Sequence, residues 1–136
     1  MKKHLAIFDK ITAQRILNGQ KTVETRFSKA KIAPFAQIGI GDTVFIKPSG
    51  QDIIGQFKVA KVIFYQGLDQ TDWQYIKATY GQKLSLGTNQ ENEKYFNSHS
   101  NAIYGSIIFI TRVEQFITSP IKFTKKDLRG WVVLEN

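Results

Sequence analysis

Two cations and one carboxylate stand close together between Gly19 and Arg26, where the sequence reads GQKTVETR. Lys21 is a flexible point charge, whereas Arg26 presents a planar fork of donors that suits a phosphate or the carbonyl-rich edge of a base. Glu24 can orient either cation or accept hydrogen bonds from a base amino group. These residue types predict a site for an anionic or strongly polar ligand. The alternative is an ion pair that only fastens the fold.

A helix, a stop and a strand are predicted to position these groups. Asp9 can N-cap a helix that Asn18 and Gly19 end, which leaves Lys21 just past a helix terminus. The residues 22–27 alternate in character and predict a strand. Thr22, Glu24 and Arg26 are then expected on one face, and Val23, Thr25 and Phe27 on the other.

The rest of the chain predicts an α+β protein with several short strands and few helices. Thr71 with Gln74 predicts a capping box for a helix ending at Gly81, and Thr88 with Glu91 predicts a shorter helix near Tyr95. Further strands are expected over 5–8, 43–47, 53–65, 103–114 and 130–134. This number of short strands favours a small barrel.

Length and composition indicate one domain over residues 1–136, in which a single core buries most of the apolar surface. The sequence has 19 Lys and Arg against 11 Asp and Glu, a formal charge of +8 that fits a nucleic-acid partner. It has no cysteine, which excludes disulfides and thiolate chemistry. Without a signal peptide or membrane span, a cytoplasmic protein that does not bind membranes is expected.

The spacing of Gly19, Lys21, Glu24 and Arg26 spells GxKxxExR and resembles the ASCH family of PUA-like domains. The turn at Ile40 to Asp42 and the closing strand after residues 127–131 also resemble this family. The resemblance implies a small PUA-like mixed β-barrel with a few peripheral helices. It further implies a cleft beside the barrel, floored by the motif, that binds RNA or a nucleotide.

Some ASCH proteins are hydrolases of acetylated cytidine, in which the motif lysine works with a threonine nucleophile and a later acidic residue. Lys21 matches that lysine, but Glu24 occupies the place of the nucleophile, so Thr22 is the remaining candidate. Lys21, Thr22 and Glu24 are the catalytic candidates if the protein is an enzyme. Others resemble ribonucleases, which need only general acid and base groups in a basic cleft. A protein-interaction domain without chemistry is the third alternative.

Three residues outside the motif are additional candidates for ligand contact. Lys47 ends a predicted strand near the expected cleft, and Tyr104 and Ser106 share one face of a late strand. With Lys21, Glu24 and Arg26, they complete the predicted binding set.

Other polar patterns are assigned no role in the site. His4 and His99 are the only histidines, so neither a metal site nor a cofactor is expected. The segment 98–100, Ser-His-Ser, is interpreted as a polar surface loop, and the basic segment 122–126 as a solvated turn. Trp73 and Tyr80 are expected to pack inward from one helix face.

Overall fold

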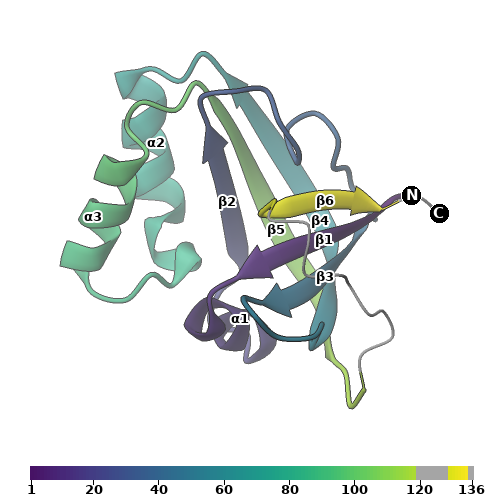
Figure 1. The fold of residues 1–136 in the computed structure, drawn as a ribbon. Helices are drawn as coiled ribbons and strands as arrows, with labels where there is room; N and C mark the ends of the chain where they lie inside the picture. The colour runs from purple at the N-terminus through teal and green to yellow at the C-terminus, as the bar shows by residue number, and fades with distance from the viewer. Residues whose placement is uncertain (119–128, 135–136) are drawn as a thin grey trace.

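The computed structural model describes residues 1–118 and 129–134 and forms a curled, half-barrel sheet (Figure 1). In this part of the chain, six strands follow the order β2-β5-β4-β3-β1-β6. Their bounds are β1 (Lys3–Phe8), β2 (Val23–Ser28), β3 (Thr43–Pro48), β4 (Gly55–Gln66), β5 (Tyr104–Gln115) and β6 (Trp131–Leu134). β1 pairs with β3 in parallel, and the other neighbours are antiparallel. The expected α+β fold with a mixed barrel-like sheet is confirmed, and the basic segment 122–126 lies outside the described residues.

The helices are α1 (Lys10–Leu17), α2 (Gln70–Tyr80) and α3 (Asn89–Ser98), with a 3-10 turn η1 (Gly81–Leu84). Figure 1 shows α2 and α3 as a layer beside β2, while α1 lies where β1 ends and β2 begins. Both helices of the layer belong to the connection between β4 and β5, so they are an insertion between two paired strands. No helix in the described ranges is long and apolar enough to cross a membrane.

Helix caps agree with two of the predicted starts and correct the third. Asp9 accepts a hydrogen bond from the Thr12 amide at 2.7 Å, and Thr88 caps α3. The capping box of α2 is formed by Asp69 and Asp72, two residues before the predicted pair. Carboxylates are strong acceptors for the free amides of a first turn, so Asp69 starts the helix earlier. The predicted helix end at Gly81 is confirmed: α2 ends at Tyr80 with Gly81 as its C-cap, and the chain then continues into η1.

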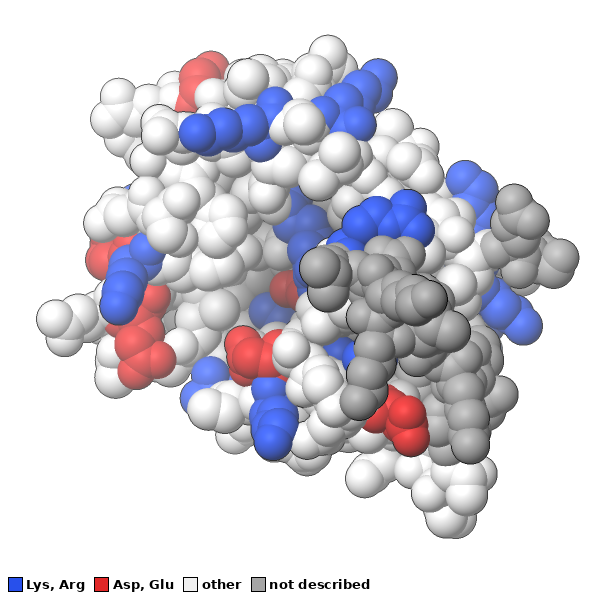
Figure 2. All heavy atoms as spheres, viewed as in Figure 1, with Lys and Arg blue, Asp and Glu red and all other residues white. Residues whose placement is uncertain are grey.

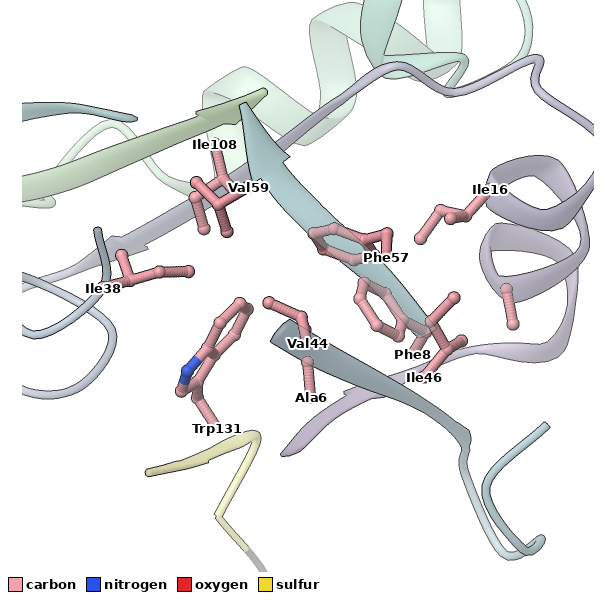
Figure 3. Close-up of a cluster of buried hydrophobic side chains, with 11 residues drawn as sticks. Ala6, Phe8, Ile16, Ile38, Val44, Ile46, Phe57, Val59, Ile108 and Trp131 are labelled. Atoms are coloured by element: carbon pink, nitrogen blue, oxygen red, sulfur yellow. The ribbon is translucent and has the colours of Figure 1, made fainter. Parts of the chain in front are cut away.

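Three apolar clusters pack against the sheet in the described residues, and two of them lie next to the elements that carry the site. Inside the half-barrel, Phe8, Phe57 and Trp131 lie in one cluster with the aliphatic side chains of Figure 3. On the other side, Val23 and Ile107 pack against the helical layer, with Phe27 next to them. The second cluster is completed by Ile76, Tyr80, Leu84 and Phe96. β2 is therefore held between the barrel interior and the helices.

The half-barrel stays open between β2 and the β1–β6 pair, which stand at opposite ends of the strand order. The Arg26 side chain crosses this opening: Nη2 donates to the Ile7 carbonyl at 3.1 Å and Nη1 to the Gly130 carbonyl at 3.3 Å. We call the opening the seam and define its borders as residues 7–8 of β1, 24–27 of β2 and 130–131 at β6. The hydrogen bonds of Arg26 thus connect the two borders of the seam, as backbone hydrogen bonds connect neighbouring strands elsewhere in the sheet.

Candidate functional site

The position of Lys21, the first residue of the site, is set by the way in which α1 ends. Asn18 closes the helix, and Gly19 takes a φ of +82°, a left-handed conformation that a side chain would disfavour. The turn is completed when the Lys21 amide donates to the Arg15 carbonyl at 2.9 Å. The lysine side chain is then buried, with 2% of its surface exposed, and Nζ donates to the Leu84 carbonyl of η1 at 3.0 Å.

Glu24 lies between the two cations, and both of its oxygens accept hydrogen bonds or ion-pair contacts. Oε1 is 3.3 Å from Lys21 Nζ and accepts from the Thr25 amide at 3.0 Å. Oε2 accepts from Arg26 Nε at 3.2 Å and from Nη2 at 3.1 Å. Burial acts to raise the pKa of Glu24, but the charges of Lys21 and Arg26 and the Thr25 amide outweigh it, so the pKa is lowered. The carboxylate is ionised at neutral pH.

Arg26 is the more accessible cation, and aromatic rings fix its plane. Its Cζ lies 5.0 Å from the centre of the Phe8 ring and 5.1 Å from that of Trp131. Its side chain is 23% exposed, against 2% for Lys21. The guanidinium therefore borders solvent while its hydrogen bonds connect the two borders of the seam.

These three residues floor a cavity of about 380 Å³ that we call the main cavity. Its remaining lining comes from β1, α1, β2, α3 and the loop before α3: Ile7, Phe8, Asp9, Thr12, Thr25, Phe27, Leu86, Tyr95 and His99. Figure 2 shows this face of the molecule hollowed at its centre, with basic and acidic atoms both visible inside the hollow. The floor carries two cations and one carboxylate, and Asp9 on the wall adds a second carboxylate, so the charged groups of the lining balance.

A pair of hydroxyl groups forms one wall of the main cavity. The Thr25 and Tyr95 hydroxyl oxygens are 2.7 Å apart, and the Tyr95 hydroxyl also lies 3.4 Å from the Thr25 carbonyl oxygen. Burial, and then the charge of Glu24, raises the pKa of Tyr95, so this phenol keeps its proton. The wall therefore presents neutral hydroxyls beside a charged floor.

His99 stands next to this wall at the C-terminal end of α3. Its ring centre is 4.5 Å from that of Tyr95, and Nδ1 lies 2.9 Å from the Tyr95 carbonyl oxygen. A carbonyl oxygen only accepts, so Nδ1 carries a hydrogen and Nε2 of the neutral ring remains an acceptor. Ser98 and Ser100 are exposed, as predicted for a polar surface segment, but the insertion folds back onto β2 and brings His99 to the cavity.

The structure separates the sequence-predicted residues into two groups. Lys21, Glu24 and Arg26 meet at the floor of the main cavity. Thr22 is exposed and lies before β2, outside the cavity lining, which corrects the expectation that it shares a face with Glu24 at the site. The remaining candidates lie elsewhere: Lys47 in β3 outside the cavity lining, Tyr104 packed on Phe35, and Ser106 in a neighbouring cavity.

Thr25 reaches the cavity although it was expected to face away. The alternation itself holds, since Val23 and Phe27 pack toward the helices while Glu24 and Arg26 turn toward the seam. β2 borders the seam on its unpaired side, so groups from both of its faces reach the same opening. Asp9 also lines the main cavity, but the sequence identified it only as the N-cap of a helix.

No family model and no curated protein match the sequence. The ASCH protein of Zymomonas mobilis matches the structure with a TM-score of 0.63 at 15% identity, over 84% of this chain and 70% of that one. A substituted variant of that protein gives a TM-score of 0.69 at 13% identity, over 98% and 89%. The ASCH domain of Lactobacillus crispatus gives 0.53 at 11%, over 82% and 80%.

This chain has an ASCH-like fold. At these identities the likeness concerns the fold, and it confirms the architecture that the GxKxxExR spacing predicted. The ASCH-like half-barrel explains why the motif residues lie beside a cavity: β2 is the strand that borders the seam, so side chains from its middle stand at the opening. Among the described residues, no cluster of His, Asp and Glu is placed to hold a metal ion.

Proposed function

We propose that this ASCH-like protein binds single-stranded RNA or a free nucleotide by holding one nucleoside unit in the main cavity. The observation that carries the proposal is the floor, where two cations share one ionised carboxylate beneath a cavity of about 380 Å³. That volume falls within the roughly 300–1,000 Å³ of small-molecule sites. The formal charge of +8 over the chain favours an anionic ligand, and Arg26 is the cation of the floor that borders solvent.

The walls complement the two parts of a nucleoside. Phe8, Phe27 and Tyr95 supply ring surface on which a base can stack. Asp9, Thr25 and the His99 Nε2 atom offer acceptors and hydroxyl groups for the exchangeable hydrogens of a base or a ribose. A ligand that is only a phosphate would leave these groups unused.

Binding is favoured over the threonine–lysine hydrolysis because of the contacts that Lys21 makes. Its Nζ donates to the Leu84 carbonyl at 3.0 Å and lies 3.3 Å from the Glu24 carboxylate, so both contacts are those of a hydrogen-bond donor, and no threonine hydroxyl is among them. Thr22, the nucleophile candidate, is exposed outside the cavity lining. The Thr25 hydroxyl lines the cavity, but its partner is the neutral Tyr95 phenol and not a base.

The direct test is a titration of the protein with nucleoside monophosphates and short single-stranded RNA at low salt, read by calorimetry. A Thr12→Trp variant fills the cavity from its α1 wall without removing a floor group, and we expect it to weaken binding by about tenfold or more, equivalent to about 1.4 kcal/mol. Gln14→Trp places the same ring on the exposed side of α1 and serves as the matched control.

Electrostatic attraction gives a second readout of the same binding. The logarithm of the RNA association constant should fall linearly with the logarithm of the salt concentration, with a slope of about −0.7 for each phosphate neutralised. The proposal is wrong if neither nucleotides nor RNA bind at low salt, or if Thr12→Trp and Gln14→Trp bind equally well.

A further inference from the structure

A second cavity adjoins the main cavity on the far side of Arg26. Arg26 and Phe27 line both cavities, so the guanidinium is a shared wall. The second cavity measures about 150 Å³, and its other lining residues are Ser28, Ile32, Ala33, Pro34, Phe35, Ser106, Gly130 and Trp131. Both cavities therefore follow the seam, one after the other.

Ser106 places an unusual polar group against this second cavity. Its side chain is 1% exposed, and its Oγ has no hydrogen-bond partner within the described structure. Ser106 is the register partner of Arg26 across β5 and β2, so the two side chains leave the same face of the sheet. Buried hydroxyl groups are nearly always hydrogen-bonded, and an orphan that lines a cavity indicates a partner that enters from the cavity.

The volume of the second cavity limits the size of the ligand group that it can hold. About 150 Å³ is below the roughly 300–1,000 Å³ that hold a whole small ligand, so it suits a fragment of a larger one. Phe35 and Trp131 give it aromatic surface. Because it touches the main cavity at Arg26, the rest of that ligand can lie on the other side of the guanidinium. A third cavity of about 570 Å³ also borders it along Ile32, Ala33, Gly130 and Trp131, but that cavity contains none of the motif residues Lys21, Glu24 and Arg26.

At the boundary between the two cavities, one N–H group of Arg26 has no hydrogen-bond partner among the described residues. Nε and Nη2 donate to Glu24 and to the Ile7 carbonyl, and Nη1 donates once, to the Gly130 carbonyl. A guanidinium has five N–H groups, so one N–H of Nη1 has no partner among the described residues. A charged donor between two ring-sized compartments matches an anionic linker that joins two rings.

We propose that the second cavity is a subsite for the neighbouring nucleotide of an RNA strand. In this arrangement one base occupies the main cavity, the next base accepts or donates a hydrogen bond at Ser106 Oγ, and Arg26 contacts the phosphodiester between them. The inference rests on the proposed function and deepens it, because it makes a strand of two or more nucleotides the ligand and not a free nucleoside.

The test compares a mononucleotide with a dinucleotide by calorimetry on the whole chain. The wild-type protein should bind the dinucleotide at least about tenfold more tightly. Ser106→Ala should remove a large part of that gain and leave mononucleotide affinity unchanged. Because the hydroxyl has no hydrogen-bond partner among residues 1–118 and 129–134, this variant should unfold at the same urea concentration as wild type, which separates a ligand contact from a structural role. Ser49→Ala, at an exposed position, is the matched control.

The outcomes distinguish the two proposals. Equal affinities for mononucleotide and dinucleotide, or a Ser106→Ala protein that keeps the full gain, overturn the second subsite while the main cavity stands. A protein that binds neither ligand overturns both. Ile32→Trp, at an exposed position on the wall of the second cavity, gives an independent check, since it should also reduce the gain of the dinucleotide.

Discussion

Thr25 and Tyr95 meet across the wall of the main cavity, with their hydroxyl oxygens 2.7 Å apart although 70 positions separate them in the sequence. The contact joins β2 to α3, so it ties the helical insertion to the strand that carries the site. A ligand in the main cavity would rest against a wall whose position depends on this bond.

Replacement of Tyr95 by Phe should lower the free energy of unfolding by about 1 kcal/mol, because it removes a partly buried hydrogen bond while the ring stays packed on Phe27 and Phe96. Urea denaturation measures the change. Tyr104→Phe is the control, since that ring packs on Phe35 and its hydroxyl has no hydrogen bond among the described residues. Equal losses in the two variants would contradict the assigned role of the Thr25 contact.

Glu24→Gln should destabilise the protein more than Lys21→Met. The carboxylate is shared by two cations, so its loss leaves both Lys21 and Arg26 without their anion, whereas loss of the lysine leaves Glu24 paired with Arg26. Removal of one partner from a buried ion pair costs about 3–5 kcal/mol, and we expect Glu24→Gln in that range. Thermal and urea unfolding of the two variants decide the order. The reverse order would show that Lys21 and not Glu24 is the centre of the network.

Stability should fall on acidification below the ordinary carboxyl pKa of 4.5. The pKa of Glu24 is lowered in the folded protein, so the unfolded chain binds its proton at a higher pH than the folded one. The stabilisation is therefore fully present above pH 4.5 and is lost as the pH falls through the lower, folded value. Urea midpoints measured between neutral pH and pH 3 should decline less steeply in Glu24→Gln than in wild type. Parallel curves would mean that the Glu24 pKa is not lowered.

Protonation of Asp42 should also contribute to the loss of stability at acid pH. Burial acts to raise its pKa, but hydrogen bonds from His4 and from the Lys2 and Gly39 amides lower it below 3.8. Because the pKa of Asp42 is also lower in the folded protein than in the unfolded chain, the stabilisation that Asp42 contributes is present above pH 3.8 and is lost as the pH falls below that value. The double variant Glu24→Gln/Asp42→Asn should show a flatter acid limb than Glu24→Gln alone. An unchanged limb would assign the residual loss to other carboxylates.

Trp131→Phe should cost about 1–3 kcal/mol because it leaves a buried acceptor without its donor. Trp131 Nε1 donates to His4 Nδ1 at 3.0 Å, and His4 Nε2 lies 2.8 Å from Asp42 Oδ2. An indole N–H only donates, so Nδ1 of His4 is unprotonated and the ring is neutral with its hydrogen on Nε2. Nitrogen NMR of the His4 ring should report this tautomer. Trp73→Phe, a half-buried indole on α2, is the control and should cost less.

The local sequence determined the parts of the site that neighbouring residues decide. Asp9 as a helix cap, the stop at Gly19 and the opposite faces of Glu24 and Thr25 all follow from short-range rules, since capping acts within one turn and strand side chains alternate with period two. The same rules placed Lys21 just past a helix end. They also made the GxKxxExR spacing recognisable, and with it the ASCH-like fold.

Only the tertiary structure decided what surrounds the motif. Arg26 bonds the Gly130 carbonyl 104 positions away, and Tyr95 and His99 reach β2 because the insertion packs against its far face. These contacts depend on how the sheet curls and where it stays open, which no local pattern encodes. For that reason Ser106 was a candidate by its strand face alone, and its unpartnered hydroxyl beside a second cavity became visible only in the folded chain.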